Sequence, residues 1–248
     1  MLEYCAHAAA APLVYEVAAA TGGLIDPTLI ASAVIALCVV AVLVVSGVPL
    51  RELGLRLCDV PRALALMIAL HGALQLAIVA VVLVRGERLV PAQRDASAAI
   101  GVYVAQLFGN TPVEEAVYRG FLFRQLVVRA RLRGHGVGGV VAATALAAAL
   151  FGLAHIPLRI HQGYHGLDLI ATLVIAALGG ALVSFLYVRG RNLMFLIVLH
   201  TLFNDQVPLF VSPVPSQWLF CMLAIGAIVW IELSARRGAR MPWRRTPP

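Results

Sequence analysis

Two adjacent glutamates and an arginine interrupt an otherwise apolar part of the chain, in the stretch Asn110-Thr111-Pro112-Val113-Glu114-Glu115-Ala116-Val117-Tyr118-Arg119. Glu115 and Arg119 are four residues apart, so on a helix they share a face and can pair. Glu114 points about 100° away from Glu115, toward a different neighbour. The stretch therefore predicts one structural ion pair and one carboxylate that is left for another partner.

The residues before the glutamates predict a helix start. Thr111 can act as an N-cap, and Pro112 suits the first helical position because its missing N–H has no bond to lose there. Glu114 then falls at the third helical position and completes a capping box. We expect the preceding helix to end near Asn110 and a new helix to begin with these residues.

The composition around this stretch indicates a membrane protein. Of 248 residues, 61% are hydrophobic and 12% are charged, and the mean hydropathy is +0.92. An average soluble domain is about half apolar and about a quarter charged. The composition therefore excludes a soluble globular enzyme and a disordered chain.

The net charge of +7 comes from 19 basic residues, all of them Arg. They stand in short clusters between apolar runs, a pattern typical of cationic loops beside membrane spans, so no role in binding nucleic acid is expected. The four cysteines have no Cys-x-x-Cys spacing, which argues against a zinc knuckle or a disulfide framework.

An all-α fold follows, a polytopic helical membrane protein with seven or eight transmembrane helices and a site in the core of the bundle. Five expected spans are Thr28–Val48, Arg62–Val84, Gly138–His155, Leu167–Val188 and Gln217–Leu233. Two more are shorter or interrupted: one comprises Ser97–Gly109 and, after the break, Val113–Arg131, and the other is Asn192–Val207. An eighth is expected if Ala8–Ile25 inserts. We expect an amino-terminal region (1–95) with two or three helices, a core (96–234) and an Arg- and Pro-rich tail (235–248).

The arginines predict the orientation. From residue 112 onward one side of the predicted membrane carries only Arg159, and the other carries ten arginines: Arg129, Arg131, Arg133, Arg189, Arg191, Arg236, Arg237, Arg240, Arg244 and Arg245. Arginine-rich loops stay in the cytoplasm. The carboxyl terminus is therefore expected in the cytoplasm. The predicted site near Glu114 and His155 is expected to open on the other side of the membrane.

Two further polar pairs lie inside predicted spans. Phe151 and His155 are four residues apart, as are His200 and Asn204. Charged groups in a bilayer cost about 2.5–3.5 kcal/mol each and usually face a cavity or a partner. Each group taken alone also has a structural explanation, such as a helix cap, an ion pair or an interhelical hydrogen bond. His71 and Gln75, also four apart, are interpreted as such a packing pair.

Together the three groups resemble the motifs of the CPBP (Abi) intramembrane proteases, a family that includes the type II CAAX prenyl endopeptidases. The motifs are Glu114-Glu115-x-x-x-Arg119, Phe151-x-x-x-His155 and His200-x-x-x-Asn204, in this order on separate helices. The resemblance covers residues 111–230. It implies a prokaryotic cytoplasmic membrane protein that hydrolyses a peptide bond of a membrane-anchored protein or peptide near the membrane surface.

The chemistry of such a reaction suggests a role for each side chain. Glu114 can activate water as a general base, and His155 can hold that water or protonate the leaving amine. His200 and Asn204 can donate hydrogen bonds to the oxyanion.

The other motif residues are expected to support these groups. Glu115 and Arg119 would orient Glu114, and Phe151 would pack in the wall of the pocket.

A zinc-dependent protease is the competing chemistry. Glu114, His155 and His200 form a ligand set that zinc accepts, and the family is often labelled metalloprotease. Against zinc, the chain has no His-Glu-x-x-His, and Asn204 is better suited to hydrogen bonding. The resemblance implies that some members are glutamate-dependent and free of metal. A mechanism without a cofactor is therefore favoured.

Two alternatives lie outside catalysis. One is a membrane immunity or scaffold protein that binds a partner through the same fold. The other is a small transporter, which is disfavoured because the sequence has neither an inverted repeat nor paired broken helices.

Overall fold

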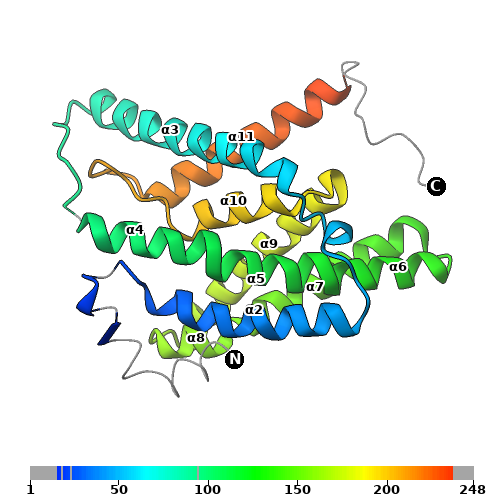
Figure 1. Ribbon diagram of the computed structural model, residues 1–248. Helices are drawn as coiled ribbons and strands as arrows, with labels where there is room; N and C mark the ends of the chain where they lie inside the picture. The colour runs from blue at the N-terminus through cyan, green and yellow to red at the C-terminus, as the bar shows by residue number, and fades with distance from the viewer. Residues whose placement is uncertain (1–15, 18, 23, 94, 237–248) are drawn as a thin grey trace. The chain divides into compact units, whose positions relative to one another are not determined.

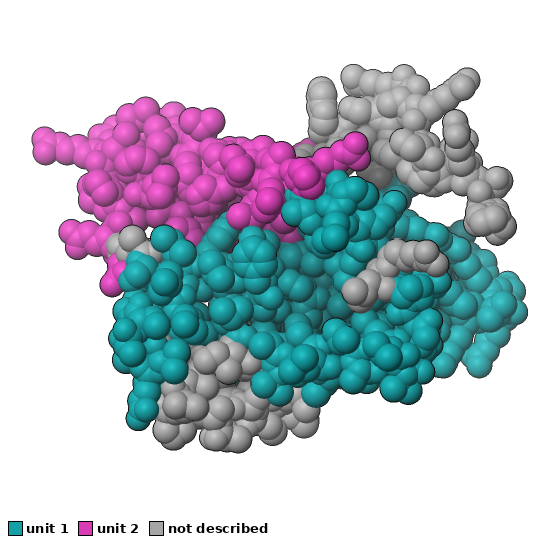
Figure 2. Space-filling model, in the orientation of Figure 1, with its two compact units in different colours: residues 1–60, 96–197 teal, residues 61–95, 198–248 magenta. Residues whose placement is uncertain are grey.

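The computed structural model describes residues 16–17, 19–22, 24–93 and 95–236. It divides into two compact units, shown in different colours in Figure 2. The first unit comprises residues 1–60 and 96–197, and the second comprises 61–95 and 198–248. The regular structure of the described residues is helical, as the sequence predicts.

The helices are labelled in Figure 1. Their bounds are α2 Pro27–Val45, α3 Val60–Val84, α4 Ala96–Ala105, α5 Thr111–Glu115, α6 Arg124–Leu132, α7 Gly136–Ala154, α8 Ile156–His161, α9 Gly166–Gly190, α10 Leu193–Asn204 and α11 Ser216–Arg236. Two π-helical segments, Gln106–Asn110 and Ala116–Phe123, lie between α4 and α6.

Three helices of the described chain are long and apolar enough to cross a membrane: Leu57–Val84, Gly136–His161 and Gly166–Gly190. Large apolar side chains are exposed along them, such as Ile68 at 72% and Leu178 at 65%. Exposed apolar side chains on such helices are stable against lipid rather than water, so the chain is an integral membrane protein. The total of seven or eight spans stays a prediction. The tail 237–248 and most of the segment Ala8–Ile25 fall outside the described residues.

The predicted break at Asn110 is wrong, because helical backbone continues without interruption from Ala96 to Leu132. Asn110 has helical dihedral angles, with φ −62° and ψ −55°. Thr111 does not cap a new helix. Its backbone N–H and its Oγ1 both donate to the carbonyl oxygen of Gln106, and Oγ1 lies 2.5 Å from it.

Pro112 explains why the run becomes a π-helix at this point. A proline inside a helix contributes no N–H and crowds the carbonyl four residues earlier, here that of Phe108. In the π segment, hydrogen bonds reach five residues back and the turn is wider, so the backbone passes the proline without ending. Glu114 therefore lies in the middle of a helical run and not in the first turn of a new helix.

A core of buried apolar side chains holds the first unit together. It includes Leu53, Phe123 and Tyr187, and a loop joins it where the hydroxyl of Tyr187 donates to the carbonyl of Leu53 at 3.0 Å. The backbone N–H of Leu193 donates to the carbonyl of Gly54 at 3.1 Å. Gly54 has φ +85°, and a Cβ there would lie 2.4 Å from the carbonyl oxygen of Arg191. Only glycine fits this contact.

The second unit contains α3, most of α10, and α11. The segment before α4 pairs with the segment after α10 through an isolated antiparallel bridge between Pro91 and Phe210. The backbone N–H groups of Ala92 and Val211 donate to the carbonyls of Leu209 and Val90 at 2.9 and 2.8 Å. This pairing fixes the chain that leaves α10, six residues beyond Asn204.

Candidate active site

The predicted ion pair between Glu115 and Arg119 is present and almost completely buried. Nη1 of Arg119 donates to Oε1 of Glu115 at 3.1 Å, and the two side chains are 2% and 0% exposed. Nη2 of Arg119 donates to the carbonyl of Gly180 on α9 at 3.3 Å. The arginine therefore joins the Glu114–Glu115 helix to α9.

Phe151 packs against this ion pair. Its ring centroid lies 4.3 Å from the guanidinium carbon of Arg119, within the range of a favourable cation–π contact. Tyr118 meets the same ring edge-on, with centroids 5.1 Å apart and planes at 88°. The sequence predicted Phe151 as a wall of the pocket, but did not indicate Tyr118 or the stacking on Arg119.

Gly180 leaves the space that the contact between Phe151 and Arg119 needs. A Cβ at this position would lie 3.0 Å from Cδ1 of Phe151 and 3.3 Å from Nη2 of Arg119. Both distances are short for carbon contacts, so a larger residue would displace the ring or the guanidinium. The hydroxyl of Ser184 donates to the carbonyl of Gly180 at 2.8 Å, which gives that carbonyl two donors.

His155 follows the last residue of α7, and its orientation is fixed from its own helix. Nδ1 lies 2.7 Å from the carbonyl oxygen of Phe151, and the His155 ring packs on the Phe151 ring with centroids 4.6 Å apart. A carbonyl oxygen only accepts hydrogen bonds, so Nδ1 carries the proton. In the neutral imidazole, Nε2 is then the acceptor that can bind water or a metal.

The α6–α7 hairpin has a register that its contacts define. Facing residues of an antiparallel hairpin are equally distant from its turn. Ala130 and Gly139 lie four and five residues from Gly134, and a Cβ on Gly139 would be 2.8 Å from the Cβ of Ala130.

The same register continues deeper in the first unit. Tyr118 and Phe151, which are in contact, lie sixteen and seventeen residues from Gly134. Glu114 and His155 follow at twenty and twenty-one residues, one helical turn further on. Glu114 and His155 are therefore at similar numbers of residues from the turn of this hairpin.

Glu114 and Glu115 differ in burial, as their positions on the helix predict. Glu115 is completely buried, whereas Glu114 is half-buried with its Oε2 shielded from solvent. The fixed partner of Glu115 is Arg119. Of the two side chains, Glu114 is thus the one that is partly exposed.

His200 and Asn204 belong to the second unit, on one face of α10. His200 is buried, and Asn204, the last residue of the helix, is exposed. The side-chain amide of Gln206 donates to the carbonyls of Leu202 and Phe203, both at 2.9 Å. These bonds satisfy helix-end carbonyls that otherwise lack a donor and fix the turn that carries Asn204.

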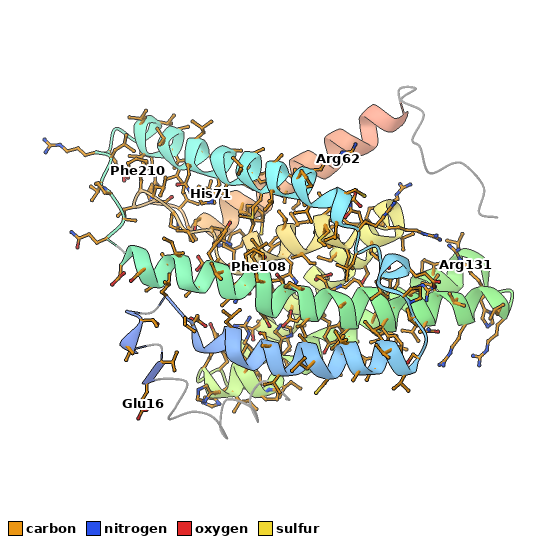
Figure 3. All side chains as sticks on the ribbon, in the orientation of Figure 1. Glu16, Arg62, His71, Phe108, Arg131 and Phe210 are labelled. Carbon is orange, nitrogen blue, oxygen red and sulfur yellow. The ribbon has the colours of Figure 1, made fainter. Side chains whose placement is uncertain are left out.

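Gln75 on α3 contributes to this region in a way that the sequence did not indicate. Its amide nitrogen lies 3.2 Å from Nε2 of His71, which confirms the predicted pair (Figure 3 labels His71). The same amide also donates to the carbonyl of Val207 at 3.3 Å and accepts from the N–H of Leu209 at 2.9 Å. Val207 has φ +40°, a strained conformation for a β-branched residue. Gln75 thus holds a strained backbone segment three residues after Asn204.

The structure brings together Glu115, Arg119, Phe151 and His155 by direct contacts, and Glu114 is the residue before Glu115 on the same helical run. His200 and Asn204 form a second group on α10.

Comparison with known proteins agrees with the interpretation of the motifs. Residues 96–205 match the family model described as type II CAAX prenyl endopeptidase Rce1-like, and this range contains all three motifs. No curated protein and no solved structure matches the chain. The chain therefore carries an Rce1-like, type II CAAX prenyl endopeptidase domain in residues 96–205, which confirms the family that the three motifs predicted.

Proposed function

We propose that this protein is an intramembrane endopeptidase that uses Glu114 to activate water. One observation carries the proposal: Glu115, the sequence neighbour of Glu114, belongs to a network with Arg119, Phe151 and His155, of which all but His155 are buried, inside the segment that matches the protease family. A buried ion pair seldom adds stability over apolar packing. A network of this kind is well suited to holding the adjacent carboxylate in one position.

In the proposed reaction, Glu114 takes a proton from water as the water oxygen attacks the scissile carbonyl carbon. The new C–O bond leaves a negative charge on the former carbonyl oxygen. When the C–N bond breaks, the leaving amine takes the proton from Glu114 or from His155. If His155 supplies the proton, it receives one from Glu114 in turn. Water is consumed, Glu114 returns to the carboxylate, and the products are a carboxylic acid and an amine, which become a carboxylate and an ammonium by proton transfer, so atoms and charges balance.

The proposed role of His155 follows from its tautomer. Nδ1 is engaged with the carbonyl of Phe151, so Nε2 is the nitrogen that accepts. Nε2 can accept a hydrogen bond from the attacking water and orient it toward the substrate. It can later carry a proton to the leaving amine, because the bond at Nδ1 persists in the imidazolium form.

His200 and Asn204 are the proposed donors to the oxyanion. The carboxamide of Asn204 has two N–H groups, and an imidazole N–H of His200 can supply another. Loss of one such donor typically costs about 3–4 kcal/mol of transition-state stabilisation. The bonds of Gln206 to the end of α10 support this role, because a donor must be preorganised to contribute.

A zinc-dependent version remains the alternative, and the same histidine geometry suits it. An imidazole that donates Nδ1–H to a backbone carbonyl offers Nε2 to a metal in many zinc sites. Glu114, His155 and His200 would hold the ion, which would supply a Lewis acid and an activated water. The geometry of His155 suits both mechanisms. The metal-free mechanism is favoured because the chain has no His-Glu-x-x-His and because Asn204 is better suited to hydrogen bonding than to binding zinc.

The proposed substrate is a membrane-anchored protein or peptide, cut close to the membrane surface. The ten arginines that the sequence assigns to one side of the membrane beyond residue 112 would hold the carboxyl terminus in the cytoplasm. The site would then open on the other side, which favours maturation or sorting of exported, anchored proteins over CAAX-type processing in the cytoplasm. An epitope tag after Pro248, probed with protease on intact cells, tests the orientation. A tag cleaved from outside would reverse it.

The decisive experiment replaces Glu114 with Gln, which keeps the size of the side chain but removes the base. Membrane peptides from cells with the wild-type and the Glu114→Gln protein are compared by mass spectrometry. Asp168→Asn, the same change at an exposed site in α9, is the control. We expect uncleaved substrates to accumulate only in the Glu114 variant. Identical peptide profiles at equal expression would favour the immunity or scaffold function.

A separate experiment tests whether activity depends on zinc. The purified protein is treated with a strong chelator, and activity and zinc content are measured on the same sample. Retained activity without zinc supports the glutamate mechanism. One zinc per chain, with activity lost on its removal and regained on its return, would replace it with the zinc mechanism.

A further inference from the structure

A groove of about 550 Å³ lies between α6 and α7, on the first unit and away from the proposed active site. Each helix contributes one face. From α6 and its end come Leu126, Arg129, Ala130 and Arg133, with a helical spacing of three and four residues, and from the start of α7 come His135, Gly138, Gly139, Ala142, Ala143 and Leu146. α6 and α7 run side by side and are joined by a short turn (Figure 1).

The groove has a cationic end and an apolar body. Arg129, Arg133 and His135 lie at the end near the turn, and apolar side chains such as Leu126 and Leu146 line the rest. Among the described residues, no hydrogen bond or salt bridge engages the side chains of these three basic residues. Cations on a protein surface without acidic partners attract an anionic ligand.

The neighbouring residues indicate that this ligand belongs to a membrane. Leu132 and Val137 flank the turn and are 83% and 82% exposed. Apolar side chains that exposed are stable when they enter the hydrocarbon, while the adjacent arginines remain at the level of the head groups. A soluble anion would use the cationic end, but it would leave the apolar body of the groove empty.

We propose that the α6–α7 groove is a binding site for an anionic phospholipid. The phosphate group would lie between Arg129, Arg133 and His135, and an acyl chain would run along Leu126 and Leu146. Basic pockets between transmembrane helices are known to bind anionic head groups, and each arginine near the surface contributes about tenfold or less to the affinity. The proposal does not depend on the protease function.

Glycine provides the space for the lipid. A Cβ on Gly139 would lie 2.8 Å from the Cβ atoms of both Ala130 and His135, so the helices touch there. A Cβ on Gly138 would meet nothing within 4 Å. Gly138 therefore opens into the groove, and a larger side chain at that position can fill the groove without disturbing the helix contact.

The test measures retention of phosphatidylglycerol by the purified full-length protein in detergent, using native mass spectrometry, with phosphatidylcholine of the same acyl chains as the neutral comparison. Two variants act on different halves of the groove. Arg129→Gln/Arg133→Gln removes charge and leaves the space, whereas Gly138→Leu fills the space and leaves the charge. Arg85→Gln/Arg88→Gln, in another loop, removes the same charge elsewhere.

We expect the wild type and the Arg85/Arg88 control to retain phosphatidylglycerol in preference to phosphatidylcholine. The Arg129/Arg133 variant should bind it about tenfold or more weakly, and Gly138→Leu should lower retention of both lipids. If the arginine variant does not fold, lipid retention by the Gly138→Leu variant tests the proposal by itself. Wild-type retention by the folded groove variants overturns the proposal. So does an equal loss in the Arg85/Arg88 control, or full displacement by inorganic phosphate at the same concentration as the lipid.

Discussion

The guanidinium carbon of Arg119 lies 4.3 Å from the ring centroid of Phe151, and this contact joins the first two sequence motifs into one structure. Arg119 comes from the motif of the paired glutamates, and Phe151 from the motif that ends at His155. The ring is also in contact with His155 and Tyr118. A change in any of these side chains should therefore be transmitted to the others.

Replacing Arg119 should be far more damaging than replacing an arginine in a more exposed ion pair. Arg119→Ala leaves the carboxylate of Glu115 buried without its partner, which typically costs about 3–5 kcal/mol. Arg124, on the same helical run as Arg119, makes a more exposed pair with Glu52, and Arg124→Ala should cost about 1 kcal/mol or less. Thermal unfolding in detergent compares the two.

Arg119→Lys separates the charge of Arg119 from its shape. Lysine keeps the positive charge but has neither the planar group that covers Phe151 nor the fork that reaches both Glu115 and Gly180. We expect intermediate stability and a reduced kcat with a smaller change in KM, because Glu114 would be less well positioned. A Lys variant with wild-type activity and stability would contradict the role given to the stack.

The neighbouring glycines of α9 allow a matched comparison. Gly180→Ala introduces a Cβ at 3.0 Å from Phe151 and 3.3 Å from Arg119, and should destabilise the protein by about 1–3 kcal/mol. Gly179→Ala meets nothing within 4 Å and should be neutral, or stabilising by up to about 1 kcal/mol. Unfolding of both variants is measured in the same detergent. Equal effects would mean that the space at Gly180 is not needed.

The bond from His155 to the carbonyl of Phe151 predicts a single tautomer. Nitrogen chemical shifts of the protein labelled at histidine should show Nδ1 protonated and Nε2 unprotonated for this residue. A His155→Ala variant identifies the signal. His165, which is exposed just before α9, should show the mixture typical of a solvated imidazole. The opposite tautomer at His155 would exclude Nε2 as the acceptor for water.

Gln75 should control the order of the chain after α10. Gln75→Leu removes the donor to Val207 and the acceptor for Leu209, leaving both backbone groups without these bonds. We expect faster hydrogen exchange over residues 207–211 and lower activity. Val207→Gly, which relaxes a strained φ of +40°, should restore part of the stability lost in the Gln75 variant. Unchanged exchange in Gln75→Leu would show that the bridge between Pro91 and Phe210 holds the segment alone.

The local pairings were accessible from the sequence because they depend on helical spacing. Glu115 with Arg119, Phe151 with His155, and His71 with Gln75 are each four residues apart, and each pair is in contact. The long apolar helices were predictable for a similar reason, because lipid selects for composition and length.

The helix start predicted at Thr111 was wrong because two local rules agreed but tertiary contacts prevailed. Threonine before proline favours a cap, yet Gly109 packs so closely on α2 that a Cβ would lie 3.1 Å from the Cβ of Ser32. The π turns on both sides of Glu114 and Glu115 let the helix continue through this contact. A spacing rule applied to one stretch of sequence cannot detect a contact with a residue 77 positions away.

The sequence by itself determined that lipid is the solvent, that the fold is helical, and which polar residues are exceptional, because these follow from composition and from periodicities within one helix. Only the tertiary structure decided that the guanidinium of Arg119 stacks on Phe151, that Gly180 leaves the space for this contact, and that Gln75 holds the chain after α10. These relationships join residues 29 to 132 positions apart, and they depend on how closely the helices pack.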